Sequence, residues 1–229
     1  MTLESKHDLA MRMAALARDV AMPTAMEEVL RGVTAAVLEL IPGAEHSGVL
    51  LLGKGKDYET LAPTDNLMFD LDHLQVETGQ GPCVEAAVDD LIVRTDDFEE
   101  ELRWPDYRPK VLELGIRSAL SFKLYTATRT AGALNIFSSK PDAFDAESEA
   151  IGSVLAAHAA AAIVASRQGE QLQSALSSRD LIGQAKGIIM ERYGVDALRA
   201  FDMLRELSQS GNVKLVDIAK QVIDTRSNG

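Results

Sequence analysis

The chain has few cysteines, few aromatic residues and no long uninterrupted apolar run, and each shortage excludes a class of protein. Its single cysteine, Cys83, excludes an intramolecular disulfide and an all-cysteine metal site. The longest apolar stretch, Ile151 to Ala165, is interrupted by polar residues and is too short to span a bilayer. The first residues show no basic start followed by an apolar core, so no secretory signal is visible. We therefore expect a cytoplasmic protein with no membrane partner.

Basic residues are fewer than acidic residues overall, but the excess of acidic residues is unevenly distributed along the chain. The net charge is −12 over 229 residues. From Gln173 onward there are eight basic and seven acidic residues, so this segment carries +1 and residues 1–172 carry −13. A nucleic-acid-binding surface needs a local basic face rather than a basic total. A charge of +1 is a weak electrostatic footprint, so any nucleic-acid binding by the C-terminal segment is expected to have modest affinity and strong salt dependence.

Hydrophobic periodicity and turn residues predict helices mixed with short strands, followed by helices alone. Predicted helices cover 5–21, 24–40, 82–87 and 106–114, and predicted strands cover 47–52, 58–62, 91–93, 118–126 and 131–138. Residues 66–76 are expected to form a loop or a short helix beside a pocket. Asp145 caps a long helix that runs without proline to Arg192, and shorter helices follow near 197–207 and 214–223. This order indicates an α+β domain built on one antiparallel sheet flanked by helices, joined by the long helix to an all-α three-helix module.

Several motifs of the first domain carry a family resemblance. They are Glu77-x-Gly-x-Gly-Pro-Cys-x-Glu-Ala, Arg103-Trp-Pro105, Gly115-x-Arg-Ser118, Gly132-Ala-Leu-Asn135 and Ala156-Ala-His-Ala159. Together they resemble the GAF domain found in actinobacterial GAF–ANTAR regulators, over about residues 5 to 165. The resemblance implies a sensor domain whose small-molecule ligand is unknown. The candidates for its pocket are Cys83, Trp104 and Asn135.

Cys83 has two interpretations because it stands at the start of a predicted helix. Backbone amides at a helix N-terminus can lower the pKa of a thiol and make it a redox or ligand sensor. We favour the alternative, a small buried apolar residue. The four histidines, His7, His46, His73 and His158, show no metal-ligand spacing. With no nucleophile–base pair, metal cluster or phosphate loop in the sequence, we expect no catalytic residue, no metal site, no cofactor and no enzymatic activity.

The last 55 or so residues contain three short amphipathic helices that carry basic residues. They resemble the ANTAR domain, a three-helix RNA-binding module of bacterial transcription antitermination regulators, at Ala175, Leu176, Ser178, Arg179, Ile182, Ala185, Lys186, Gly187, Met190, Ala200, Phe201, Leu204, Arg205, Ser208, Leu215 and Ala219. The resemblance implies binding to hairpin RNA of a nascent transcript, which prevents terminator formation.

Candidate RNA contacts follow from side-chain chemistry. Phosphates or splayed bases would meet Arg179, Lys186, Arg192, Arg205 and Lys214, and base edges would meet Gln184, Ser208 and Asn212. Gly187 lies within a helix, where glycine is about 1 kcal/mol less favourable than alanine. A close approach of RNA or of another helix would explain this glycine. The alternative is that the charged residues are solvated and paired along their own helices.

The long helix carries an apolar stripe with 4-3 spacing that favours a helix–helix contact. It consists of Ile151, Leu155, His158, Ala162, Ala165, Gly169, Leu172 and Leu176. A parallel homodimer through this stripe would place two RNA modules side by side. The alternative is that its first part only covers the sheet of its own domain, and both can hold. We place the boundary in this helix, with a GAF-like sensor at 1–165 and an ANTAR-like module at 166–229.

These observations predict a transcription antitermination regulator in which the sensor controls RNA binding by the C-terminal module. The alternative is a small-molecule-binding sensor whose C-terminal helices serve dimerisation or protein partnering, an interpretation that the near-neutral charge of this segment supports. A DNA-binding helix-turn-helix would fit the lengths of the last two helices, but the long leading helix and the ANTAR resemblance argue against it.

Overall fold

The computed structural model describes residues 26–53, 56–88, 91–124 and 132–227. The helix predicted over 5–21 and the start of the next predicted helix at residue 24 lie outside these ranges. Residues 125–131, between the two strands predicted over 118–126 and 131–138 and including their ends, also lie outside them. The described chain divides into two compact units, Met1–Ser166 and Arg167–Gly229. Each unit is described by itself.

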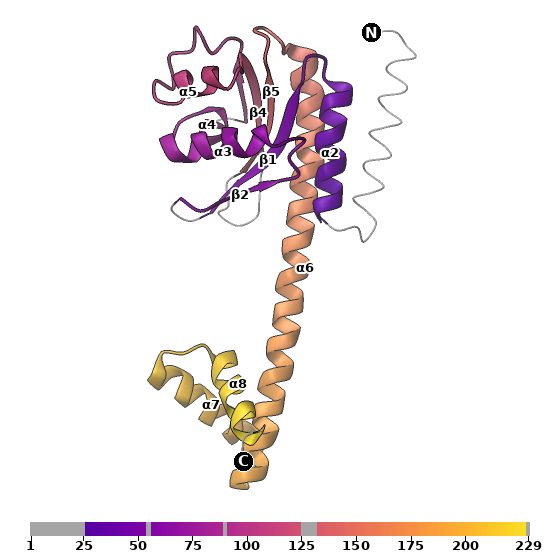
Figure 1. Ribbon diagram of the computed structural model, residues 1–229. Helices are drawn as coiled ribbons and strands as arrows, with labels where there is room; N and C mark the ends of the chain where they lie inside the picture. Colours follow the sequence, from indigo (N-terminus) through magenta and orange to yellow (C-terminus); the bar gives the residue numbers. More distant parts are fainter. Residues whose placement is uncertain (1–25, 54–55, 89–90, 125–131, 228–229) are drawn as a thin grey trace, which may run out of the picture. The chain divides into compact units, whose positions relative to one another are not determined.

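The first unit is built on a five-stranded sheet with the strand order β2-β1-β5-β4-β3 (Figure 1). Its strands are β1 His46–Leu52, β2 Tyr58–Leu61, β3 Ile92–Thr95, β4 Ser118–Leu124 and β5 Gly132–Ser138. Every neighbouring pair is antiparallel, with Leu50 opposite Thr60 in the first hairpin and Ser121 opposite Asn135 in the centre of the sheet. The predicted α+β class with one antiparallel sheet is therefore confirmed.

Of the helices in the described ranges, five belong wholly or partly to this unit. They are α2 Met26–Leu40, α3 Leu67–Thr78, α4 Pro82–Val88, α5 Arg108–Glu113 and the first part of α6 Ala146–Tyr193. The sequence did not decide between a loop and a short helix for residues 66–76. In the structure most of them belong to helix α3. The long helix is continuous from Ala146 to Tyr193, as its periodicity predicted. It begins at a side-chain cap, because Asp145 Oδ1 accepts a hydrogen bond from the Ser148 backbone amide at 2.9 Å.

The sheet separates two buried layers because successive side chains of a strand point to opposite faces. On β5, Leu134 and Ile136 pack with α2 and α6, whereas Ala133 and Phe137 pack with α3, α4 and α5. Figure 1 shows α2 and α6 on one face of the sheet and α3 to α5 on the other. Both faces are therefore covered, and Asn135, between Leu134 and Ile136 on β5, points into the layer of α3 to α5.

The N-terminal part of α6 lies unusually close to the sheet. A Cβ atom at Gly152 would collide with the ring of Phe122 on β4, so only glycine fits at this turn of the helix. Leu155, one turn further on, is fully buried in the same layer. The close approach buries the apolar face of α6 and fixes the helix on the sheet.

The stripe predicted along α6 divides near residue 165. Ile151 and Leu155 are buried against the sheet, so the first part of the stripe covers its own domain. Gly169, Leu172 and Leu176, in the second part, are exposed. Among the described residues these later positions have no apolar partner.

Length and composition alone would allow α6 to cross a membrane, and among the described helices it is the one that meets this criterion. Of its most apolar 18-residue window, 44% is buried inside the protein. The core helix of a soluble protein meets the same criterion. Its length and composition are therefore weak grounds for a membrane span, and its buried face has a partner in the sheet.

The second unit is formed by the last part of α6, α7 Ala197–Gly211 and α8 Leu215–Ser227. Its small core contains Ala185, Ile189, Ala200, Leu204, Ile218 and Ala219. Asp196 caps α7 by accepting a hydrogen bond from the Arg199 amide at 2.8 Å. The predicted three-helix arrangement of the C-terminal segment is confirmed.

Candidate functional site

A chain of hydrogen-bonded polar side chains lies inside the apolar layer between the sheet and helices α3 to α5. Thr60 Oγ1 on β2 donates to Asp72 Oδ2 on α3 at 2.8 Å, and Asn135 Nδ2 on β5 donates to Asp72 Oδ1 at 3.3 Å. Ser121 Oγ on β4 donates to Asn135 Oδ1 at 2.8 Å. Asp72, Asn135 and Ser121 are fully buried. Side chains from strands β2 and β5 therefore bond the carboxyl group of Asp72 on α3, and Ser121 on β4 is linked to it through Asn135.

Two further buried side chains carry polar atoms that have no hydrogen-bond partner among the described residues. Gln75 Oε1 accepts from the Cys83 backbone amide at 2.8 Å, but Gln75 Nε2 is unpaired. The Tyr107 hydroxyl is also buried and unpaired. Because a buried polar group without a partner costs free energy, such atoms mark a place for an ordered water or a polar ligand. We call Asp72, Gln75, Cys83, Tyr107, Ser121 and Asn135 the polar interior.

Burial controls the protonation of this interior. It raises the pKa of Asp72 to about 7, although the hydrogen bonds from Thr60 and Asn135 favour the charged form. Burial, and secondly the negative charge of Asp72, raise the pKa of the Cys83 thiol and of the Tyr107 hydroxyl above their ordinary values. The interior therefore favours neutral groups.

Cys83 consequently lies in the environment of a structural cysteine. Its side chain is fully buried at the start of α4, among Met68, Leu71 and Ala86. Any stabilisation of a thiolate by the backbone amides of this short helix is outweighed by burial, because the pKa of the thiol is raised. This position corresponds to the small buried residue that we favoured over a redox sensor.

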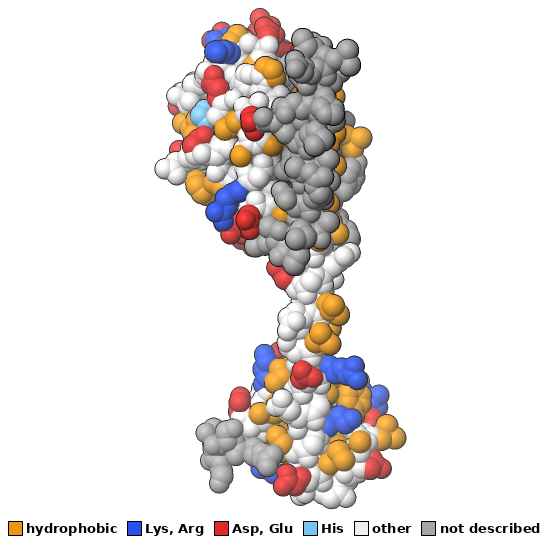
Figure 2. Space-filling view, turned by 90° about the vertical axis from the view of Figure 1, so that its right-hand side faces the viewer, with side chains coloured by type: hydrophobic (Ala, Val, Ile, Leu, Met, Phe, Trp, Pro, Cys, Tyr) orange, Lys and Arg blue, Asp and Glu red, His pale blue; other side chains and the backbone are white. Residues whose placement is uncertain are grey.

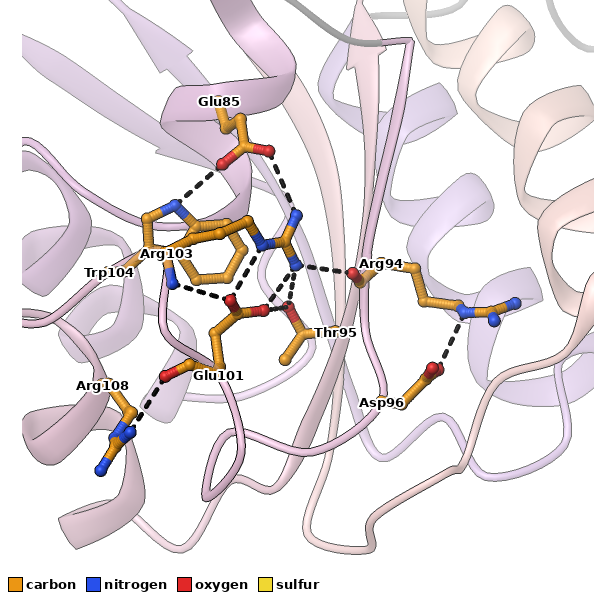
Figure 3. Close-up of polar contacts among 8 residues, drawn as sticks. All are labelled: Glu85, Arg94, Thr95, Asp96, Glu101, Arg103, Trp104 and Arg108. Atoms are coloured by element: carbon orange, nitrogen blue, oxygen red, sulfur yellow. Dashed lines mark hydrogen bonds and ion pairs between the residues drawn. The ribbon is translucent and has the colours of Figure 1, made fainter.

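Trp104 closes one side of the same layer and is tied to helix α4 (Figure 3). Its ring is buried, and its Nε1 donates to Glu85 Oε2 on α4 at 3.0 Å. The guanidinium of Arg103 lies over the indole ring, 4.3 Å from its centroid. Arg103 also forms an ion pair with the other oxygen of Glu85 at 3.1 Å. Trp104 and Arg103 thus each bind one oxygen of the Glu85 carboxylate.

Arg103 connects α4 to strand β3 and to the loop that follows it. Its Nη2 donates to the Arg94 carbonyl at 2.9 Å and to Thr95 Oγ1 at 3.1 Å, and its Nε donates to Glu101 Oε1 at 2.9 Å (Figure 3). Burial would raise the pKa of Glu101, but the hydrogen bonds and charge of Arg103 hold it below its ordinary value. Arg103 is thus the common partner that links α4 to β3 and to Glu101 beside the polar interior.

Sequence reasoning named Cys83, Trp104 and Asn135 as pocket candidates and did not name Asp72, Gln75, Tyr107 or Ser121. A signal for two of them existed. Met68 and Leu71 form the buried face of α3, and Asp72 and Gln75 continue that face at helical spacing. Polar residues on the apolar face of an amphipathic helix point into the core. The sequence left segment 66–76 open between a loop and a short helix, so this face was not recognised.

In the second unit, several basic side chains are paired with acids on their own helices. Arg199 pairs with Glu206 at 3.0 Å and Arg205 pairs with Asp202 at 2.9 Å, both on α7. On α8, Lys220 lies 3.8 Å from Asp217. For Arg205, a predicted RNA contact, the structure therefore shows a helix ion pair of the kind that the alternative interpretation described.

Four other basic residues that the sequence proposed as RNA contacts form no ion pair among the described residues. They are Arg179, Lys186 and Arg192 on α6 and Lys214 just before α8. Figure 2 shows Lys and Arg side chains of the C-terminal unit beside exposed apolar side chains. Arg179 and Lys186 are seven residues apart and share a face of α6, whereas Arg192 is displaced from Lys186 by about a third of a turn. Arg179, Arg192 and Lys214 are therefore exposed and Lys186 is half-buried, and the four do not all share one helix face.

The three residues predicted to read base edges differ in their surroundings. Ser208 Oγ donates to the Val213 carbonyl at 2.6 Å, so this hydroxyl already serves the end of α7. Asn212 ends α7 in the left-handed conformation, with φ +49°. Gln184 on α6 is exposed, and neither its side chain nor that of Asn212 forms a hydrogen bond among the described residues.

Comparison with known proteins assigns both units. Residues 23–164 match the family model of the GAF domain, and residues 170–223 match that of the ANTAR domain. No curated protein matches the chain in sequence.

Solved structures resemble the first unit. One is the GAF domain of a phosphoenolpyruvate-protein phosphotransferase from Coxiella burnetii, with a TM-score of 0.57 and 19% identity over 71% of this chain and 96% of that chain. Another is the free methionine-R-sulfoxide reductase from Neisseria meningitidis, with a TM-score of 0.57 and 18% identity over 74% and 95%. A third is the chromophore-binding domain of a bacteriophytochrome from R. palustris, with a TM-score of 0.56 and 10% identity over 74% and 64%.

At these identities the structures share the fold alone with this chain, because one fold serves many functions. The family match rests on the sequence itself and covers more than half of the chain. The chain therefore belongs to the GAF domain family and carries an ANTAR domain at its C-terminal end.

Proposed function

We propose that this chain is a cytoplasmic transcription antitermination regulator that binds hairpin RNA of a nascent transcript through its ANTAR domain. The observation that carries the proposal is the ANTAR match over residues 170–223, which covers a folded three-helix unit. The surface of that unit exposes basic side chains that no acid neutralises among the described residues, including Arg179 and Arg192. RNA phosphates are the partner that free surface cations attract.

Control by the sensor is the second part of the proposal. The GAF domain encloses a polar interior in which Gln75 Nε2 and the Tyr107 hydroxyl lack partners. A small polar ligand that satisfied them would favour one packing of α3, α4 and α5 over another. Such a ligand would shift the population of sensor states, and α6, which begins on the sheet, is the continuous element that leads to the RNA module.

A homodimer is the third part. The exposed apolar residues Leu172 and Leu176 lie on α6 after the sheet has ended, and Val154 is exposed on the N-terminal part of the same helix. A parallel contact between two such helices would cover Leu172 and Leu176 and bring two ANTAR domains together, as two RNA hairpins would require. Replacing both leucines by glutamate should yield a monomer in analytical ultracentrifugation, and an unchanged dimer would contradict this contact.

The RNA-binding proposal is tested by mobility shift at several salt concentrations, with a two-hairpin RNA and a DNA duplex of equal length. The test variant is Lys186→Ala/Arg192→Ala, and the matched control is Arg199→Ala/Lys220→Ala, which removes the same charge from side chains paired with acids. Each lost phosphate contact should reduce the slope of log affinity against log salt by about 0.7–0.9. We expect RNA-selective binding that the test variant loses and the control largely keeps.

The rival function is a ligand-binding sensor whose C-terminal helices serve dimerisation or protein partnering. The exposed leucines of α6 favour it, because an apolar surface suits a protein partner. It predicts that the test variant and the control behave alike and that neither the full chain nor residues 166–229 alone shift the RNA.

A further inference from the structure

One face of α6 in the second unit combines free cations with an exposed aromatic ring. Arg179, Lys186 and Tyr193 follow one another at intervals of seven residues, which is close to two helical turns, so they share a face. Tyr193 is 59% exposed and forms no hydrogen bond or ring contact among the described residues. Phe201, the other aromatic residue after position 166, is half-buried. The ring of Tyr193 is therefore the aromatic surface that this unit presents to a partner.

Two glycines on or beside this face have no contact among the described residues that would require glycine. A Cβ atom at Gly183 or at Gly187 would meet nothing within 4 Å, so the packing of the described residues requires glycine at neither position. Both have ordinary helical conformations, where alanine would be the more stable residue. Gly152, near the start of the same helix, differs because the ring of Phe122 fills the space that a Cβ would need. At Gly183 and Gly187 the helix backbone is instead left open to a partner from outside.

The chemistry of this face identifies the partner. Cations without an acidic partner attract phosphate, and an aromatic ring beside them offers a stacking surface to an unpaired base. A protein partner would be expected to cover apolar side chains with apolar side chains, whereas here the exposed ring follows two unpaired basic residues along the helix. We propose that Tyr193 stacks on an unpaired loop base of the RNA, while Arg179 and Lys186 contact the backbone phosphates and the open helix surface at Gly183 and Gly187 admits the nucleotide. The proposal rests on the RNA-binding function proposed above.

The test measures RNA affinity of the full-length protein by fluorescence anisotropy with a labelled two-hairpin RNA. Stacking of one base is worth roughly fivefold to a hundredfold in affinity, so Tyr193→Ala should weaken binding by a factor in that range. Tyr193→Phe keeps the ring and should bind within about threefold of wild type. Leu207→Ala is the control, since Leu207 is a half-exposed apolar side chain on α7.

RNA in which single loop bases are replaced by abasic sites identifies the stacking base. For the base that contacts Tyr193, the abasic RNA and the alanine variant should each weaken binding, and the two together should weaken it little further. Gly187→Ala gives an opposed pair of effects. It should raise the melting temperature of the C-terminal unit by roughly 4–8 °C and at the same time weaken RNA binding.

The outcomes separate the two proposals. Wild type that binds RNA with an affinity unchanged by Tyr193→Ala overturns the stacking proposal alone. An absence of RNA binding by wild type under all sensor conditions and by residues 166–229 overturns the function proposed above and the stacking proposal with it. A loss in Tyr193→Ala that Tyr193→Phe restores supports the stacking ring, because both variants keep the charge of the surface.

Discussion

The buried carboxyl group of Asp72 should make the stability of the sensor domain fall as the pH rises toward neutrality. In the folded protein its pKa is raised to about 7, mainly by burial, whereas an unfolded chain ionises this group near 3.8. Between these values the native state holds a proton that the unfolded state has released. The free energy of unfolding therefore decreases with increasing pH across this window and levels off above it.

The size of the effect follows from the difference between the two pKa values. Each unit corresponds to 1.36 kcal/mol, so the full change between about pH 4 and pH 8 is at most about 4 kcal/mol. Asp72→Asn keeps the shape of the side chain and an acceptor for Asn135, but it has no charge to bury. We expect this variant to be nearly independent of pH in this window and more stable than wild type at pH 8 by roughly 2–4 kcal/mol.

Urea unfolding of both proteins between pH 5 and pH 8, followed by Trp104 fluorescence, measures this difference. Trp104 is the only tryptophan of the chain and is buried in the sensor domain, so its signal reports that domain. Carboxylates with a lowered pKa, such as Asp97 beside Arg117, lose their stabilising effect only at more acidic pH. Asp70→Asn removes a charge from an exposed position of the same helix and should keep the wild-type pH dependence. If the free energy of unfolding depended on pH equally in wild type and Asp72→Asn, the argument would be refuted.

Three further predictions test particular contacts. Gly152→Ala forces a methyl group against Phe122 and should lower the stability of the sensor domain by about 1–3 kcal/mol in urea unfolding, where a neutral result would contradict the close approach of α6 to the sheet. Asp196→Ala removes the cap of α7 and should cost about 1 kcal/mol, measured as a lower melting temperature of residues 166–229, whereas Asp196→Asn should recover most of it. Arg103→Gln removes the shared partner of Glu85 and Glu101 and should increase hydrogen exchange of the α4 amides more than of the α5 amides; equal protection would show that the ion pairs do not hold α4.

Local patterns explain why much of the architecture was predictable. Asp145 precedes a helix-forming segment without proline, and a cap together with continued helix propensity predicts a long helix wherever it packs. The alternating pattern of 131–138 likewise indicates a strand with two distinct faces. These signals depend on residues close together in the chain, so they can be interpreted without knowledge of the tertiary structure. The motifs around Cys83 and Lys186 added the family resemblance in the same local way.

The candidate sites depend on residues that are distant in the sequence. Asp72 meets Thr60 from a neighbouring strand and Asn135 from 63 residues further on, and no local pattern encodes that contact. Burial by the surrounding elements then moves the pKa of the carboxyl group, which depends on its environment rather than on its neighbours in the chain. The charged residues of α7 illustrate the same point, because only the structure shows that Arg205 is paired with Asp202.

The sequence by itself determined the two-domain organisation, the antiparallel sheet, the long helix and the basic residues of its C-terminal end. Tertiary structure decided which of these side chains are available to a partner. Gly152 and Gly187 are both helical glycines in sequence, yet the first faces an aromatic ring and the second faces open space. Helical propensity treats them alike because it is a property of the local backbone. What surrounds each residue is set by packing, and packing distinguishes a glycine that fits the core from one that leaves the helix backbone uncovered.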